Sequence, residues 1–149
     1  MSIEIVLVPL AIAAVGAVRA ALVEDAPYRE VQVASRLRDG ALVAQALGDL
    51  GAVVGSADHD RIEAVHDGRA SAWTRTDAGL WVARFDASWD ESAALALVAE
   101  LDAAYGLRVQ QEVLRKIRER APGAGMSVAS ETVGDDDTVT LVLDVGSGR

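Results

Sequence analysis

Three consecutive segments with strand-like alternation, joined by very short loops, constrain the fold of this chain most strongly. The segments are residues 61–66, 69–76 and 80–86. Asp67-Gly68 is a two-residue loop of the kind that requires positive φ, and Asp77-Ala78-Gly79 is a three-residue loop with glycine at its left-handed position. Because loop length sets the pairing register, these loops predict an antiparallel meander with one defined register.

The predicted register also decides which side chains share a face. The expected cross-strand pairs are Ile62 with Trp73, Ala64 with Ser71, His66 with Arg69, Arg75 with Trp81, Trp73 with Ala83, and Ser71 with Phe85. One face then carries Ile62, Ala64, Trp73, Trp81 and Phe85, and the other carries Val65, Ala72, Thr74, Leu80 and Val82. We expect the aromatic face to form the core, because aromatic pairs reinforce a sheet and bury large areas.

Two helices are predicted, each beginning at an aspartate that can cap free backbone N–H groups. The first follows Asp39, ends before Gly51, and has apolar residues at helical spacing: Leu42, Val43, Ala46, Leu47 and Leu50. The second follows Asp90 and runs to about Arg120, where Ala121-Pro122-Gly123 ends it. Its candidate buried positions are Leu95, Val98, Leu101, Tyr105, Val109, Val113 and Ile117.

Three further strands complete the expected fold. Residues 29–35 alternate between polar and apolar side chains, as do residues 138–145, which follow a strand near residues 127–133 and a turn at 134–137. The residues of the last strand that are expected to face the core are Val139, Leu141, Leu143 and Val145. The chain is therefore predicted to be α+β, with an antiparallel sheet of about six strands and two helices on one face. The expected order is β-α-β-β-β-α-β-β, preceded by an N-terminal hydrophobic helix.

The N-terminal hydrophobic segment, residues 5–23, is interrupted only by Arg19. Its length is close to the roughly 20 apolar residues that a membrane span needs. A membrane anchor and a helix covered by a protein partner are the main alternatives, and a secretory signal is disfavoured because no basic residue precedes the segment. We expect two parts: residues 1–26, the hydrophobic helix with its junction, and residues 27–149, a single domain. The predicted interaction residues are Val8, Ile12, Val15 and Leu22.

Composition excludes some classes of function and indicates a setting. The formal net charge of −9 argues against a nucleic-acid surface, since duplex binding needs clustered Lys and Arg. The absence of cysteine excludes disulfides and thiolate metal sites, and is consistent with a reducing compartment. Lys116 is the only lysine among 14 Lys and Arg residues, which suggests a GC-rich bacterial genome. The expected location is the cytoplasm or, if the N-terminal segment spans a membrane, its cytoplasmic face, because the basic residues follow that segment.

No catalytic, cofactor-binding or metal-binding residue is assigned from the sequence. The one cluster with metal-ligand types is Asp58, His59, Asp60, Glu63, His66 and Asp67. The predicted register puts Glu63 and His66 on opposite faces of a strand, which disfavours convergence on an ion. The acidic run at residues 135–137 is expected to be a solvated turn. The glycines of GAVVGS, residues 51–56, do not open a helix and are a weak candidate for phosphate binding.

Residues 30–145 resemble the plastid and cyanobacterial family called Ycf thirty-five, also known as domain of unknown function twelve fifty-seven. The resemblance rests on VQVASRLRDGALVAQALGDLGA, on LWVARFDASWD, and on LDAAYGLRVQQEVLRKIRERAPGAGMSVASETVGDDDTVTLVLDV. Tyr105 matches the first tyrosine of a Gln-x-Tyr-Ala-Tyr-like patch in that family, whereas Ala104 and Leu107 depart from the patch. The resemblance implies an accessory protein without established chemistry, and AAA+ ATPases as the first partners to test.

Three functional hypotheses follow. The first is a non-enzymatic accessory or assembly protein that docks to a partner complex or membrane through its N-terminal helix. The second is a small-ligand sensor with a pocket between the face of Trp73, Trp81 and Phe85 and the long helix. The third is a metal-dependent enzyme that uses His59 and His66. A homo-oligomer is left open.

Overall fold

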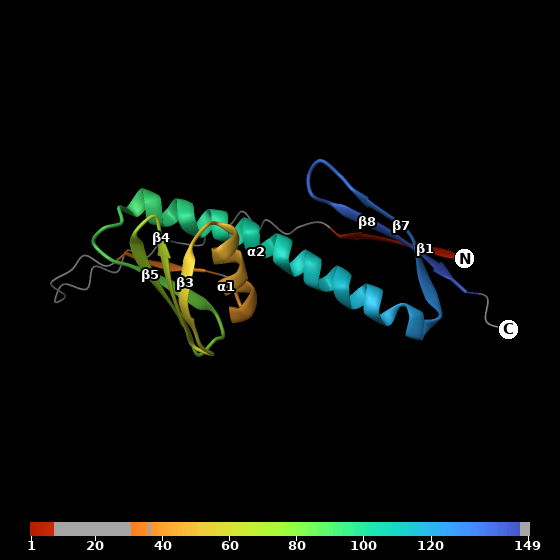
Figure 1. Cartoon of the computed structure of the whole chain (residues 1–149), viewed down its shortest axis with the longest axis horizontal. Coiled ribbons are helices and arrows are strands. Elements are labelled where there is room, and N and C mark those ends of the chain that lie inside the picture. The colour runs from red at the N-terminus through yellow and green to blue at the C-terminus, as the bar shows by residue number, and fades with distance from the viewer. Residues whose placement is uncertain (8–30, 36, 147–149) are drawn as a thin grey trace. The chain divides into compact units, whose positions relative to one another are not determined.

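The computed structural model describes residues 1–7, 31–35 and 37–146. Its elements, shown in Figure 1, are β1 (Ser2–Leu7), β2 (Val31–Ala34), α1 (Gly40–Asp49), β3 (Val53–Ala57), β4 (Arg61–His66), β5 (Arg69–Arg75), β6 (Trp81–Phe85), α2 (Glu91–Arg120), the 3-10 helix η1 (Pro122–Ala124), β7 (Met126–Val133) and β8 (Val139–Val145). The described part of the chain therefore confirms the α+β class and both predicted helices.

The strands form two antiparallel sheets, so the prediction of a single sheet is wrong. The larger sheet has the order β2-β6-β5-β4-β3, and the smaller one has the order β1-β8-β7. The sequence analysis did not predict β1 or β3. In β3 the alternation is broken by a bulge between Val54 and Ser56, which hides the strand-like pattern.

The chain folds into two compact units. The central unit is Ala11–Tyr105 and contains the larger sheet, and the terminal unit combines Met1–Leu10 with Gly106–Arg149 and contains the smaller sheet. Helix α2 contributes its first half to the central unit and its second half to the terminal unit. The predicted boundary near residue 26 lies outside the described residues.

In the central unit, the meander has the register that the two short loops predict. Ile62 pairs with Trp73 and His66 with Arg69 across β4 and β5, and all three predicted pairs between β5 and β6 are present. The turn residues Asp67 and Gly68 have φ of 50° and 76°. Two consecutive residues with positive φ match the right-handed twist of a hairpin.

The aromatic face of the meander is the core of the central unit, as predicted. Its members are between 0% and 3% exposed: Ile62, Ala64, Trp73, Trp81 and Phe85. Side chains of both helices join the same buried cluster, including Leu47 of α1 and Leu101 of α2. Both helices therefore cover one face of this sheet (Figure 1).

The three tryptophans are buried with their indole N–H groups satisfied. Trp73 donates to the hydroxyl of Ser71 at 3.2 Å, Trp81 to the carbonyl of Arg38 at 3.3 Å, and Trp89 to the carbonyl of Ala70 at 2.9 Å. Burying a donor without a partner would oppose folding. These bonds let large aromatic rings occupy a small core.

Both helices begin at the predicted capping residues. The carboxylate of Asp39 accepts hydrogen bonds from the backbone N–H groups of Ala41 and Leu42, and that of Asp90 accepts one from Ala93. The predicted buried stripe of α2 is correct at Val98 and Leu101. It is wrong at Val113, which is 37% exposed, because the second half of α2 packs against a different sheet through Leu114 and its neighbours.

The first residues of the chain form a strand, so the prediction of a helix is wrong for residues 5–7. Strand β1 pairs with β8, with Ile5 opposite Leu141 and Leu7 opposite Val139. The alternation of SIEIVL and its β-branched residues favour this pairing. The rest of the predicted helix, residues 8–23, and the junction after it lie outside the described residues.

Gln110 holds the end of β1 to the turn that joins β7 and β8. It is 8% exposed, and its side-chain amide nitrogen donates to the carbonyl oxygens of Leu7 at 2.9 Å and Asp137 at 2.8 Å. One polar side chain of α2 therefore satisfies two backbone groups that belong to distant parts of the sequence. Around it, Leu114 and Ile117 pack with Leu141 in the core of the terminal unit.

We predict that Gly40→Ala destabilises the central unit. A Cβ at this position would lie 2.6 Å from Cζ2 of Trp81, and that ring is 1% exposed and hydrogen-bonded. Overpacking of this kind costs about 1–3 kcal/mol. The urea midpoint of unfolding should therefore fall.

Gly48→Ala in the same helix is the matched control, because a Cβ there meets nothing within 4 Å. Replacing a helical glycine by alanine stabilises by about 0.5–1 kcal/mol, so its midpoint should rise slightly. Equal midpoints for the two variants would contradict the close packing of Gly40 on Trp81.

We predict that Gln110→Ala loosens β1. The change leaves two carbonyl oxygens without their side-chain donor, which costs about 1–3 kcal/mol. Hydrogen exchange should speed up at the amides of Ser2–Leu7 that pair with β8, while the amides of β4 and β5 keep their protection. Gln111→Ala, an exposed neighbour on α2, should change neither. Unaltered exchange in β1 of the Gln110 variant would show that this amide does not hold the strand.

Candidate docking groove

The predicted interaction residues Val8, Ile12, Val15 and Leu22 lie outside the described residues. Over the part of the chain that the structure describes, no helix combines the length and hydropathy needed to cross a membrane.

The location predicted for a sensor pocket is filled by core side chains. Trp73, Trp81 and Phe85 are 0–1% exposed, and they share their cluster with Leu97 and Leu101 of α2. Phe85 also contacts Trp89 edge-on, with ring centroids 5.0 Å apart. These aromatic residues thus act as core, and they present no open platform to a ligand.

His66 ends β4 and His59 lies in the loop before that strand, so the two histidines do not converge. The side chain of His59 is 82% exposed, with Nε2 3.7 Å from a carboxylate oxygen of Asp60. The ring of His66 stacks on Trp89, and its Nε2 lies 3.5 Å from Asp67. Among the described residues, no group of three or more His, Asp or Glu side chains is placed to hold a metal ion.

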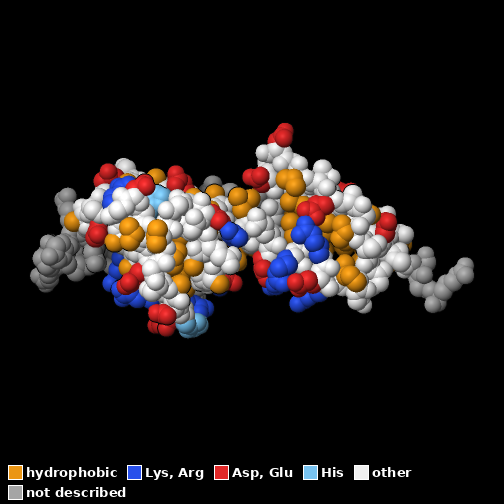
Figure 2. Space-filling view, viewed as in Figure 1, with side chains coloured by type: hydrophobic (Ala, Val, Ile, Leu, Met, Phe, Trp, Pro, Cys, Tyr) orange, Lys and Arg blue, Asp and Glu red, His pale blue; other side chains and the backbone are white. Residues whose placement is uncertain are grey.

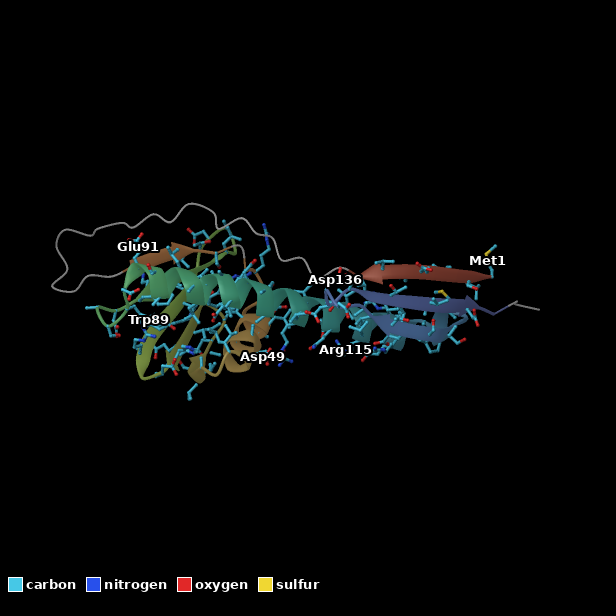
Figure 3. The ribbon with its side chains drawn as sticks, turned by 90° about the horizontal axis from the view of Figure 1, so that it is seen from above. Met1, Asp49, Trp89, Glu91, Arg115 and Asp136 are labelled. Carbon is cyan, nitrogen blue, oxygen red and sulfur yellow. The ribbon has the colours of Figure 1, made fainter. Side chains whose placement is uncertain are left out.

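The acidic run at residues 135–137 forms the predicted turn between β7 and β8. Asp136 lies at one end of the three-stranded sheet and Met1 at the other (Figure 3). A carboxylate oxygen of Asp136 accepts a hydrogen bond from the backbone N–H of Thr138 at 3.1 Å. Hydrogen bonds from the side chain and backbone of Thr138 hold the pKa of Asp136 below its ordinary value. The carboxylate of Asp136 therefore stabilises the turn.

A groove of about 400 Å³ lies in the terminal unit, where the second half of α2 meets the smaller sheet. We call it the docking groove and define it by its lining residues: Ile5, Val113, Lys116, Ile117, Arg120, Ala121, Ala124, Met126 and Leu143. All but two of these residues are apolar. In Figure 2, hydrophobic and basic side chains lie next to each other over this part of α2.

Lys116 and Arg120 are the two cations of the docking groove, one helical turn apart on α2. Arg115 forms ion pairs with the two nearby acids, because its guanidinium lies 2.6 Å from both Glu112 and Glu119. Hydrogen bonding to Arg115 also holds the pKa of Glu112 below its ordinary value. Lys116 is left with a longer contact of 3.7 Å to Glu112, and Arg120 has no ion pair within the described residues.

The docking groove was not predicted from the sequence, although several of its residues were expected in other roles. Val113 and Ile117 were assigned to the buried stripe of α2, whereas Val113 is 37% exposed and Ile117 is partly buried. One sequence feature could have indicated the groove: the long helix has more apolar residues than a single core-facing stripe requires. Ile5 lines the groove because β1 pairs with β8. The predicted helix over residues 5–23 did not allow for this strand pairing.

The chain has no significant match to a family model, to a curated protein or to a solved structure. The resemblance to the Ycf thirty-five family therefore stays a prediction.

Proposed function

We propose that this chain is a non-enzymatic accessory or assembly protein that binds a protein partner through the docking groove. The observation that supports the proposal is an open apolar groove lined by two cations, of which Lys116 has one 3.7 Å contact with Glu112 and Arg120 has no ion pair within the described residues. Exposed apolar surface that is rimmed by polar residues is typical of interaction sites. Each Å² of apolar surface covered by a partner contributes about 25 cal/mol.

The proposed partner segment carries apolar side chains flanked by carboxylates. The apolar side chains would cover Val113 and Ile117, and the carboxylates would lie beside Lys116 and Arg120. These two cations give the groove a locally positive rim on a chain with a net charge of −9, which favours an acidic partner. AAA+ ATPases, which the resemblance implies, are the first partners to test.

Residues 8–23 are proposed as a second attachment segment, in keeping with their hydrophobic sequence. The proposed setting is the cytoplasm, because a chain without cysteine needs no oxidising compartment. Binding through the groove and attachment through residues 8–23 are independent proposals, so either can be disproved while the other stands.

A photo-crosslinking amino acid at position 113 tests the groove in cells of the source organism. We expect one discrete crosslinked protein, because Val113 lies at the groove and is exposed. The same amino acid at position 53 is the control, since Val53 is 69% exposed on β3 of the central unit. Equal crosslinking at both positions would argue for unspecific contact and against the groove.

Charge reversal then tests the part played by the cations. The double variant Lys116→Glu with Arg120→Glu should lower the yield of that crosslink by about tenfold or more, because truncating or reversing interface charges costs about 2–5 kcal/mol where they are buried. Arg84→Glu, an exposed arginine on β6, should leave the yield unchanged. An unchanged yield for the double variant would contradict the proposal that the partner is acidic.

A further inference from the structure

Three basic side chains from separate segments line a second hollow, which lies wholly in the central unit. The hollow has a volume of about 650 Å³. The charged and polar residues that line it are Arg38, Asp39, Asp58, His59 and Arg75. Arg38 precedes α1, His59 follows β3, and Arg75 ends β5. Nothing in the docking groove contributes to this hollow, so an inference about it stands apart from the proposed function.

Hydrogen bonds hold the backbone beside two of these basic residues, Arg38 and Arg75. The carbonyl of Arg38 accepts the indole N–H of Trp81, and the carbonyl of Leu37 accepts the backbone N–H of the same residue at 3.1 Å. The backbone N–H of Arg75 donates to the carbonyl of Asp60 at 2.9 Å. Leu37 and Trp81 are each 1% exposed. The backbone at Arg38 is therefore well supported by the core, whereas the side chain of His59 is 82% exposed.

Arg75 and His59 are already in contact. A guanidinium nitrogen of Arg75 lies 3.4 Å from Nε2 of His59. If Nε2 accepts this hydrogen bond, the neutral ring carries its proton on Nδ1 and keeps one N–H donor for a ligand. The two side chains thus offer several donors at one side of the hollow.

Two acids also line the hollow, and they differ in role. The carboxylate of Asp39 accepts hydrogen bonds from Ala41 and Leu42, so it is committed to capping α1 and occupies the helix N–H groups itself. Asp58 has no such bond to its carboxylate within the described residues, although its backbone N–H bonds to the carbonyl of Arg61. Both carboxylates, and that of Asp60 at 3.7 Å from Nε2 of His59, oppose an anion here, and Asp58 is the one whose charge can be removed without disturbing a helix cap.

We propose that this hollow binds a small phosphorylated molecule, with its phosphoryl group held by Arg38 and Arg75 and assisted by His59. Guanidinium groups match phosphate oxygens in geometry and can bind them bidentately. A volume of about 650 Å³ falls in the usual range for small-molecule sites and exceeds what inorganic phosphate alone fills. The phosphoryl group is the recognised chemistry, and the rest of the ligand occupies the remaining space.

The test is a calorimetric titration of the full chain with inorganic phosphate, AMP and adenosine. We expect AMP to bind more tightly than inorganic phosphate and adenosine not to bind, because the phosphoryl group is required and the hollow has room for more. Binding should weaken as salt is raised, since the partners are charged. Binding of inorganic phosphate as tightly as AMP would contradict a site for a larger phosphorylated molecule, and no heat with either anion at millimolar concentration would overturn the proposal.

Two variants with opposite expected effects exclude a folding artefact. Arg75→Gln should raise the Kd for AMP by about tenfold or more, as expected for loss of a hydrogen bond from a charged donor. Asp58→Asn should lower the Kd, because it removes a charge that repels the anion. Arg84→Gln, an exposed arginine outside the hollow, is the matched control and should leave the Kd unchanged. A Kd that is insensitive to Arg75 or raised by Asp58→Asn would contradict this site.

Discussion

The pairing of β1 with β8 is the interaction on which the terminal unit depends. A two-stranded hairpin of β7 and β8 would be only marginally stable alone. Strand β1 pairs with the free edge of β8 and completes a three-stranded sheet. Gln110 fixes the end of that strand through the carbonyl of Leu7 and ties it to the turn at Asp137. Ile5 then becomes a wall of the docking groove. The proposed docking function therefore depends on the pairing of β1 with β8.

Much of the central unit could be predicted because its information is local. Two short loops determine the register of three strands, and Asp67, Gly68 and Gly79 select those loops by adopting positive φ. Once the register is known, alternation alone places Trp73 and Trp81 in the core. Capping by Asp39 and Asp90 is local in the same sense, since each carboxylate bonds backbone groups two or three residues away.

The rest depends on contacts between distant residues, which a single sequence does not encode locally. The apolar run that starts at Ile5 fits a helix by composition, and only its partner β8 makes residues 5–7 a strand. Strand β3 is disguised by a bulge beside Gly55. The groove arises because α2 serves two units, which leaves Val113 at the surface although its spacing matches a core position. The hollow at Arg38, His59 and Arg75 likewise brings together residues that lie far apart in the sequence, so no local pattern predicts it.

The central claim is that a partner covers the docking groove, and isoleucine methyl NMR tests it most directly. The chain has few isoleucines, and two of them, Ile5 and Ile117, line the groove, while Ile62 is buried in the central unit. When the crosslinked partner is added to the labelled full chain, the methyl signals of Ile5 and Ile117 should shift or broaden and that of Ile62 should stay in place. A response confined to Ile12, with Ile5 and Ile117 unchanged, would move attachment to the N-terminal segment and contradict the account.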